Sequence, residues 1–95
     1  MNRNFVQVFF DLDCEWELMP PEYRIFVNEE LFAERTYTCR NEDYSRELLQ
    51  VLAPKGVYQF RVEPLQKNIG KFTINNTEIK GKKCLLLDDN TFQIL

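Results

Sequence analysis

The fold is decided by residues 11–18, which read Asp-Leu-Asp-Cys-Glu-Trp-Glu-Leu. Acidic and apolar side chains alternate without a break along this stretch, and a period of two is typical of a β-strand with one buried face and one wet face. We expect the apolar members to point into a core: Leu12, Cys14, Trp16 and Leu18. The acidic members form an outward row, here called the acidic stripe: Asp11, Asp13, Glu15 and Glu17. The inward set continues upstream, so a strand or a bent strand pair is expected over residues 4–18, with Val6, Val8 and Phe10 inside.

Short apolar runs separated by turn signals continue through the rest of the chain. The expected strands cover residues 23–27, 31–38, 47–53, 57–63, 72–74, 84–87 and 91–95, with a further short one around Ile79. Turns are expected where Asn, Asp, Pro or Gly supply the required backbone conformations, at residues 28–30, 54–56, 75–76 and 88–90. Residues 47–53 also admit a short helix, but the Pro-Lys-Gly turn and the alternation that follow favour a hairpin with residues 57–63. Residues 39–45 are polar and predict a loop.

The pattern as a whole predicts an all-β protein. Aromatic residues make up 14% of the chain and suit a pleated, half-buried surface, while the two alanines are too few for a helical bundle. Strands do not alternate with helical segments, so a parallel α/β sheet is not expected. The predicted fold is a two-sheet antiparallel sandwich, jelly-roll-like, with about eight short strands and little or no helix. We expect a single domain over residues 1–95, and a partly open barrel is the alternative.

The residue inventory argues against an enzyme. The chain has no histidine, which removes His-based nucleophilic sites, His-ligated zinc and the usual general base near neutral pH. Its three glycines are isolated, so a glycine-rich phosphate loop is absent, and its three cysteines lack metal-ligand spacing. Paired carboxylates remain available for glycosidase chemistry, but a core this small seldom builds the necessary cleft. We therefore expect neither an enzyme nor a cofactor.

The charge pattern bears on partners and location. The net charge is −3 and the lysines scatter, so nucleic-acid binding is not expected, although folding could still gather a patch from Lys67, Lys71, Lys80, Lys82 and Lys83. No apolar run approaches transmembrane length, and we expect no membrane contact. The first residues lack the apolar core of a signal peptide, so synthesis in the cytoplasm is expected.

The acidic stripe has three interpretations. The favoured one is a solvated face whose charge is offset by cross-strand arginines, with Arg24, Arg35 and Arg40 as candidates. A contact with a basic partner is the second. Calcium is the third, but a straight strand spreads its carboxylates too widely for one ion, so no metal site is expected.

Some predicted strands are apolar on both faces. Three phenylalanines alternate with predicted core residues and so point to the other face of their strands: Phe5, Phe9 and Phe26. Phe32 directly follows Leu31, so both faces of that strand are apolar as well. Simple core packing explains such residues, and so does a contact with another chain, because large exposed apolar patches mark interaction sites. We take these four phenylalanines as interface candidates. Tyr44, in the polar loop, is the candidate for stacking on a sugar ring.

Two stretches of the chain resemble two groups of small β-sandwich proteins. Residues 23–31 contain a strand, an Asn turn and the start of a returning strand, and residues 54–62 contain a Gly followed by an alternating strand. One group is the carbohydrate-binding modules, which are mostly secreted. The other is the small all-β proteins of tailed phages, which include virion components, and the lack of a secretion signal favours it. Taken with the strands that are apolar on both faces, the resemblance favours a non-catalytic assembly or interaction protein that oligomerises, such as a phage structural or accessory protein located in the virion. A carbohydrate-binding module, with calcium assisting the glycan contact, is the alternative.

Overall fold

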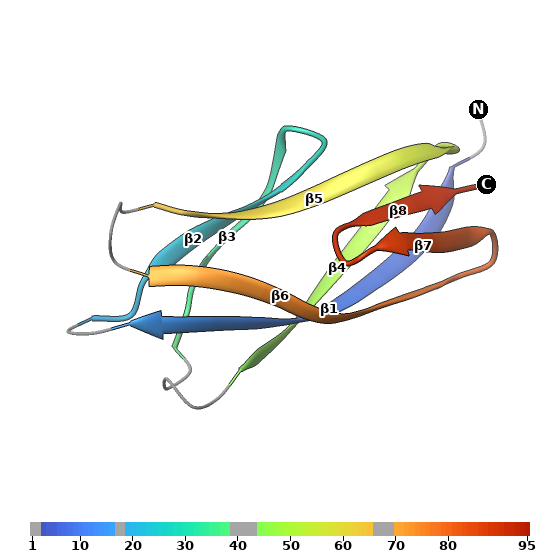
Figure 1. Ribbon diagram of the computed structural model, residues 1–95. Helices are drawn as coiled ribbons and strands as arrows, with labels where there is room; N and C mark the ends of the chain where they lie inside the picture. The colour runs from blue at the N-terminus through green and yellow to red at the C-terminus, as the bar shows by residue number, and fades with distance from the viewer. Residues whose placement is uncertain (1–2, 17–18, 39–43, 66–69) are drawn as a thin grey trace.

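The computed structural model describes residues 3–16, 19–38, 44–65 and 70–95 (Figure 1). These residues form strands and connections and contain no helix. The strands are β1 (Asn4–Trp16), β2 (Glu22–Val27), β3 (Glu30–Thr36), β4 (Ser45–Ala53), β5 (Gly56–Pro64), β6 (Gly70–Gly81), β7 (Cys84–Asp88) and β8 (Thr91–Ile94). The all-β prediction is confirmed.

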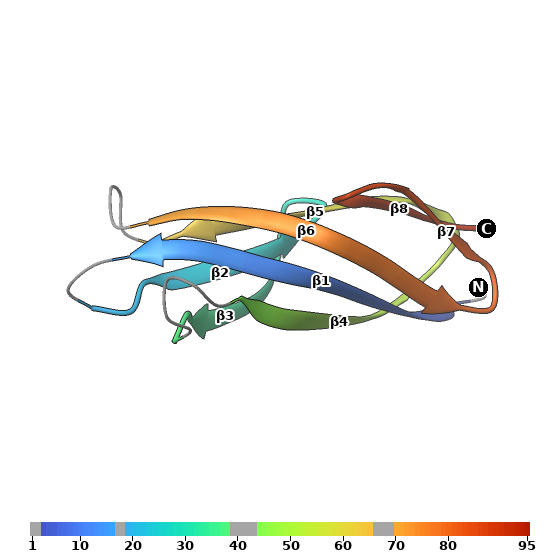
Figure 2. The same cartoon turned by 60° about the horizontal axis from the view of Figure 1, so that its bottom comes forward.

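The strands form two antiparallel sheets that pack face to face. Sheet I has the order β4-β1-β6, and sheet II has the order β3-β2-β5-β8-β7. Each neighbouring pair in both sheets is antiparallel. Figure 2 shows the two layers from the side of β1 and β6, with β3 and β4 along the lower rim. The predicted two-sheet antiparallel sandwich is therefore confirmed.

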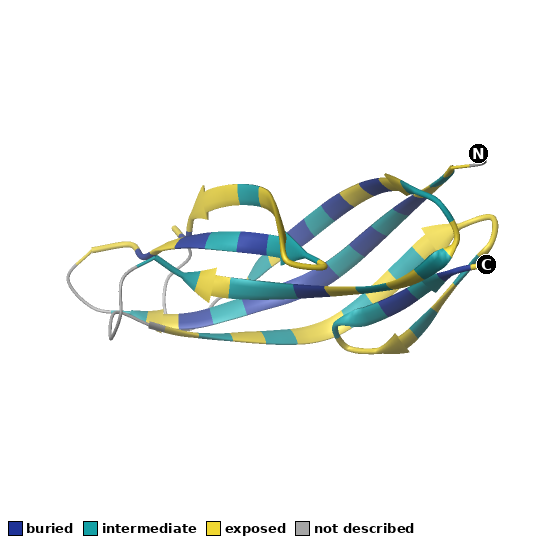
Figure 3. Cartoon of the chain, turned by 90° about the horizontal axis from the view of Figure 1, so that it is seen from above, coloured by how far each residue is buried: buried dark blue, intermediate teal, exposed yellow. Residues whose placement is uncertain are grey.

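The core lies between the sheets and follows the predicted alternation of β1. Val6, Val8, Phe10, Leu12 and Cys14 are all buried, and Figure 3 shows such alternation as coloured bands along the strands. Trp16 is half-buried, and Leu18 lies outside the described residues.

An aromatic contact joins the two layers at the centre. The ring of Phe10 on sheet I stacks on the ring of Phe60 on sheet II, with the ring centroids 4.9 Å apart. Stacked rings at this separation add to the free energy gained by burying them. The alternation read from β1 thus identifies the residues that hold the sheets together.

The β2–β3 hairpin turns where the sequence predicts. Asn28 has φ 49° and Glu29 has φ 70°, and two successive left-handed residues match the twist of a tight hairpin. The Asn28 side chain also accepts a hydrogen bond from the Gln59 amide at 2.8 Å, which ties the turn to β5.

The predicted hairpin of residues 47–53 with 57–63 is wrong. Both segments are strands, but β4 pairs with β1 in sheet I, whereas β5 pairs with β2 and β8 in sheet II. The Pro54-Lys55 connection therefore crosses from one sheet to the other, and the Tyr58 hydroxyl donates to the Pro54 carbonyl at 2.7 Å. A short turn brings two strand ends together but does not make the strands neighbours.

The predicted turn at residues 75–76 is also wrong. β6 runs unbroken through it, and the register with β1 shifts between Phe9 and Asp11. Asn76 and Thr77 both lie opposite Phe10, and Asn76 has φ 53°. An extra residue in one strand of a pair is a β-bulge, and Asn tolerates the conformation it needs.

Candidate interaction surface

Two edge strands face each other along one side of the sandwich. β3 ends sheet II and β4 ends sheet I. Within the described part of the chain, β3 pairs only with β2 and β4 pairs only with β1. We call this side the β3/β4 seam, and it leaves two rows of backbone donors and acceptors available for further pairing.

An apolar cavity opens on the β3/β4 seam. Its volume is about 310 Å³, and it is lined by Val27, Asn28, Glu30, Leu31, Phe32, Val51, Leu52, Ala53 and Tyr58. Leu52 is 61% exposed and Phe32 is 39% exposed, so the Leu52 methyl groups and the Phe32 ring both meet solvent. The cavity is part of the apolar interior that the edge strands leave uncovered.

A bulge in β3 positions Phe32 at this cavity. Ile25 pairs with Ala33 and Phe26 pairs with Leu31, so Phe32 is the extra residue between them. Bulges re-aim side chains and are common at sheet edges. Adjacent Leu31 and Phe32, which alternation would send to opposite faces, therefore both line the cavity.

A polar bridge closes the seam farther along. Arg35 on β3 lies 3.1 Å from the buried Glu47 carboxylate on β4. The Tyr23 hydroxyl donates a hydrogen bond to the same carboxylate. Burial raises the pKa of Tyr23, and the contact with Glu47 raises it further. The bridge satisfies a carboxylate that would otherwise be costly to bury.

The apolar surface continues from the seam onto the outer face of sheet I. Phe5 pairs directly with Leu52, and both side chains are exposed. Leu52 was not singled out in the sequence, although its parity with Leu48 on β4 was a usable signal. Two of the interface candidates, Phe5 and Phe32, thus lie on one exposed surface that Leu52 connects.

The other two interface candidates are covered by cations of the same chain. The Phe9 ring lies 5.8 Å from the Arg46 guanidinium carbon and 5.2 Å from the Lys80 ammonium. The guanidinium carbon of Arg61 is 4.2 Å from the Phe26 ring centroid. A cation over a ring is attracted to its negative face, and the long side chain hides apolar surface. Phe9 and Phe26 are half-buried for this reason.

The acidic stripe does not lie on one uniformly wet face. Asp11 is buried, accepting hydrogen bonds from Arg46 and from the Asn76 amide, both at 2.8 Å. The Asn76 hydrogen bond and then the Arg46 contacts hold the pKa of Asp11 below its usual value. Asp13 is half-buried, Glu15 is exposed, and Glu17 lies outside the described residues.

The arginine that pairs with Asp11 is not among those expected. Arg24 pairs with Glu34 and Arg35 pairs with Glu47, while Arg40 lies outside the described residues. Arg46 takes the role because it sits directly opposite Asp11 in the β1–β4 register. Nowhere in the described segments do three or more His, Cys, Asp or Glu gather in a way that could hold a metal ion.

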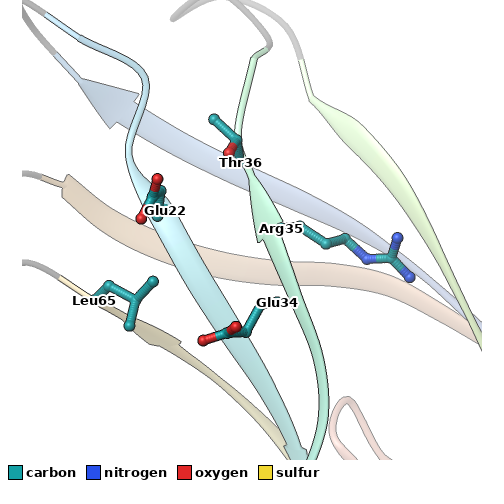
Figure 4. A pocket seen from close by; sticks show the side chains of 5 residues that line it. All are labelled: Glu22, Glu34, Arg35, Thr36 and Leu65. Carbon is teal, nitrogen blue, oxygen red and sulfur yellow. The ribbon is translucent and has the colours of Figure 1, made fainter.

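A second depression lies on sheet II, with a volume of about 220 Å³. Figure 4 shows Glu22, Glu34 and Leu65 beside it, while the Arg35 side chain extends away toward sheet I. Glu34 is already paired with Arg24 at 2.6 Å. Of the two carboxylates that line the depression, that of Glu34 is therefore already neutralised within the chain.

Tyr44, the candidate for sugar stacking, is 62% exposed and stands just before β4. None of the ring pairs found among the described residues includes it. Tyr44 is therefore an exposed ring that stacks on no other ring in the described part of the chain.

Comparisons of this chain with protein-family models, with curated protein sequences and with solved structures gave no match. The described residues include no helix of the length and apolar character needed to cross a bilayer. The fold and its surface define the class: an all-β sandwich that exposes an apolar seam between two edge strands.

Proposed function

We propose that this chain is a non-catalytic assembly or interaction protein that binds its partner through the β3/β4 seam. The observation that carries the proposal is the exposed apolar surface of Leu31, Phe32 and Leu52, beside two strand edges that pair with no further strand among the described residues. Apolar side chains supply affinity when they are removed from water, and free edges supply backbone hydrogen bonds.

The size of the exposed surface supports association. The chain exposes 6532 Å² of surface. A folded monomer of this mass typically exposes about 5,800 Å², so the excess is roughly 700 Å². A standard interface removes about 800 Å² from each partner.

The shape of the molecule explains that excess. The radius of gyration is 14.0 Å, and the extents are 47 × 23 × 17 Å. A compact domain of this length has a radius of gyration of about 12 Å. The elongated sandwich thus leaves about as much extra surface as a single partner would cover.

The resemblance of residues 23–31 and 54–62 to small β-sandwich proteins of tailed phages supports the same role. Some of those proteins are virion components, and a particle is built from repeated contacts between small folded chains. We propose that this chain is a structural or accessory component of such an assembly.

Light scattering on a sizing column tests the proposal, with the wild type compared with Phe32→Glu. We expect the wild type to run as a multiple of 11.4 kDa and the variant to run as a folded monomer. A charge at an exposed seam position disrupts association because the carboxylate would be desolvated at the contact. Circular dichroism shows whether the variant keeps its fold.

Leu87→Glu is the matched control, because Leu87 is a similarly exposed apolar residue on β7 at the far edge of sheet II. We expect this variant to remain associated. A wild type that is monomeric at every concentration would overturn the proposal. Dissociation by Leu87→Glu with no effect of Phe32→Glu would overturn the assignment to the seam.

A further inference from the structure

We propose that the partner at the β3/β4 seam is a second copy of this chain, whose β4 pairs antiparallel with β4 about a two-fold axis at Gln50. This inference rests on the proposed function and gives the association one geometry. The pairing would join the two copies of sheet I into one continuous sheet, β6-β1-β4 followed by the partner's β4-β1-β6.

β4 differs from the other edges because it is long and free of bulges, and because its two charged residues, Arg46 and Glu47, both lie near its start. β3 has a bulge at Phe32, β6 has a bulge at Asn76, and β7 is only 5 residues long. Bulges and short edges are common protections, as are prolines and charges within an edge strand. β4 is 9 residues long, keeps a regular register with β1, and contains no proline or lysine.

The second half of β4 is uncharged and largely apolar. Residues 48–53 read Leu-Leu-Gln-Val-Leu-Ala. The strand's two charged residues both precede this segment and are already paired within the chain, Arg46 with Asp11 and Glu47 with Arg35. Two copies can therefore approach along this edge without bringing unpaired charges together, despite a net charge of −3 on each.

The side chains select the register. Directly opposite residues in an antiparallel pair share one face, so a two-fold axis perpendicular to the sheet passes midway between the two copies of one residue. With the axis at Gln50, Leu48 lies opposite the second copy's Leu52 on the outer face. On the inner face, Leu49 lies opposite the second copy's Val51. The two Gln50 amides meet at the axis, where each can donate to and accept from the other.

The neighbouring registers match less well. An axis at Leu49 would place Leu48 opposite Gln50 and Arg46 opposite Leu52. An axis at Leu48 would place the buried carboxylate of Glu47 opposite Leu49. An axis at Leu52 would also pair apolar with apolar on both faces, but it would bring Pro54, which has no N–H to donate, opposite Gln50 and so shorten the ladder. Among axes from Leu48 to Val51, only the Gln50 register pairs apolar with apolar on both faces within β4, and cross-strand pairs of this kind stabilise a sheet.

The same pairing covers the cavity. Val51, Leu52 and Ala53 line the cavity at the C-terminal end of β4. In the proposed pairing, this end of β4 lies beside the N-terminal half of the second copy's β4. Each copy's Leu31 and Phe32 would then lie alongside the seam of the other. The exposed backbone edge and the exposed apolar surface would thus be buried by one contact.

Engineered cysteines test this geometry in the full-length chain. Directly opposite residues in an antiparallel pair have Cα atoms about 4.5–5.5 Å apart, which suits a disulfide. Gln50 is exposed, so Gln50→Cys should fold normally. We expect this variant to form a covalent dimer under mild oxidation. The amount should be well above that formed by the wild type, whose own cysteines set the background level of crosslinking. Gln59→Cys, exposed on sheet II, is the matched control and should stay at that background.

A second pair of variants tests the register. Leu48→Cys and Leu52→Cys should each crosslink poorly alone, because each cysteine would face a leucine of the other copy. Mixed in equal amounts, they should crosslink strongly.

Two outcomes separate this inference from the proposed function. A dimer by light scattering, with Gln50→Cys at the wild-type background, would overturn the β4–β4 pairing and leave the proposed function standing. A monomeric wild type would overturn both.

Discussion

Arg35 on β3 and Glu47 on β4 form an ion pair of 3.1 Å that spans the two sheets along their open side. The Glu47 side chain is 8% exposed, so its carboxylate depends on partners supplied by the protein. The Tyr23 hydroxyl, from the strand next to β3, is a further partner. This small network fixes the spacing between β3 and β4, and the apolar cavity lies farther along the same seam.

Tyr23→Phe should destabilise the fold. The substitution keeps the ring packed against Tyr37 and Phe72 but removes the hydroxyl that donates to Glu47. A buried polar group that loses a partner costs about 1–3 kcal/mol, and each kcal/mol shifts the melting temperature of a domain this size by about 4–8 °C. Thermal melts of the variant check this. Tyr44→Phe, at an exposed tyrosine, should melt like the wild type, and equal melts for all three proteins would contradict the role of the network.

Asp11→Asn should make the free energy of unfolding depend less on pH in the acid range. The pKa of Asp11 is lowered in the folded state by Asn76 and Arg46. A carboxyl with a depressed folded pKa stabilises the fold above its unfolded pKa of about 3.9, and that contribution disappears as the pH falls through the folded value. Urea unfolding at neutral and acid pH should therefore show a smaller loss for the variant than for the wild type.

The matched control for that experiment is Asp13→Asn, two positions along the same strand. We expect it to keep the acid sensitivity of the wild type. A wild-type acid profile in Asp11→Asn would show that the contacts with Arg46 and Asn76 contribute nothing to folding.

Phe10→Ala and Phe9→Ala should differ sharply although the residues are adjacent. Phe10 is fully buried and stacked on Phe60, and truncating such a ring costs about 3–5 kcal/mol. Phe9 is half-buried on the outer face under Arg46 and Lys80, and such cation contacts are worth about 0.5–1 kcal/mol each when exposed. Denaturant midpoints measure both. Equal losses would mean that the outer face of sheet I packs as tightly as the core.

Glu29→Gly should stabilise the β2–β3 hairpin. Glu29 has φ 70°, a left-handed conformation that costs a residue with a Cβ about 1–2 kcal/mol, and glycine adopts it freely. The variant also loses the exposed contact in which Glu29 accepts two hydrogen bonds from Arg61, but screening by solvent should keep that loss smaller than the strain that glycine relieves. We expect a higher melting temperature. Asn28→Gly is the contrast, because it gives up the Asn28 hydrogen bond to the Gln59 amide and should gain less or lose stability.

Much of the local structure could be predicted from the chain. The alternation in residues 11–18 identified the inward residues of β1, and Asn28 marked the hairpin turn that the structure contains. Both signals are local, because side-chain direction alternates along any strand and backbone conformation follows residue type. At residues 54–56 a turn signal was taken to decide which strands pair, and at residues 75–76 the asparagines that suggested a turn belong to a bulge within β6.

The candidate surface could be predicted only in part. Phe5 and Phe32 are exposed, but whether Phe9 and Phe26 are exposed depends on cations from other strands: Arg46 on β4, Lys80 on β6 and Arg61 on β5. Their positions follow from strand order and register, which a single strand's pattern does not contain. Leu52 belongs to the surface for the same reason, because its pairing with Phe5 joins residues distant in the chain.

By itself, the sequence determined that this chain forms strands and which side chains of β1 point into the core, because side-chain direction alternates between neighbouring residues of a strand. Only the tertiary structure decided that β4 and β5 belong to different sheets, that Asp11 is buried against Arg46, and that β3 and β4 are left as open edges. These outcomes depend on the pairing of segments far apart in the chain. A strand with one apolar face fits either sheet until its neighbours are in place.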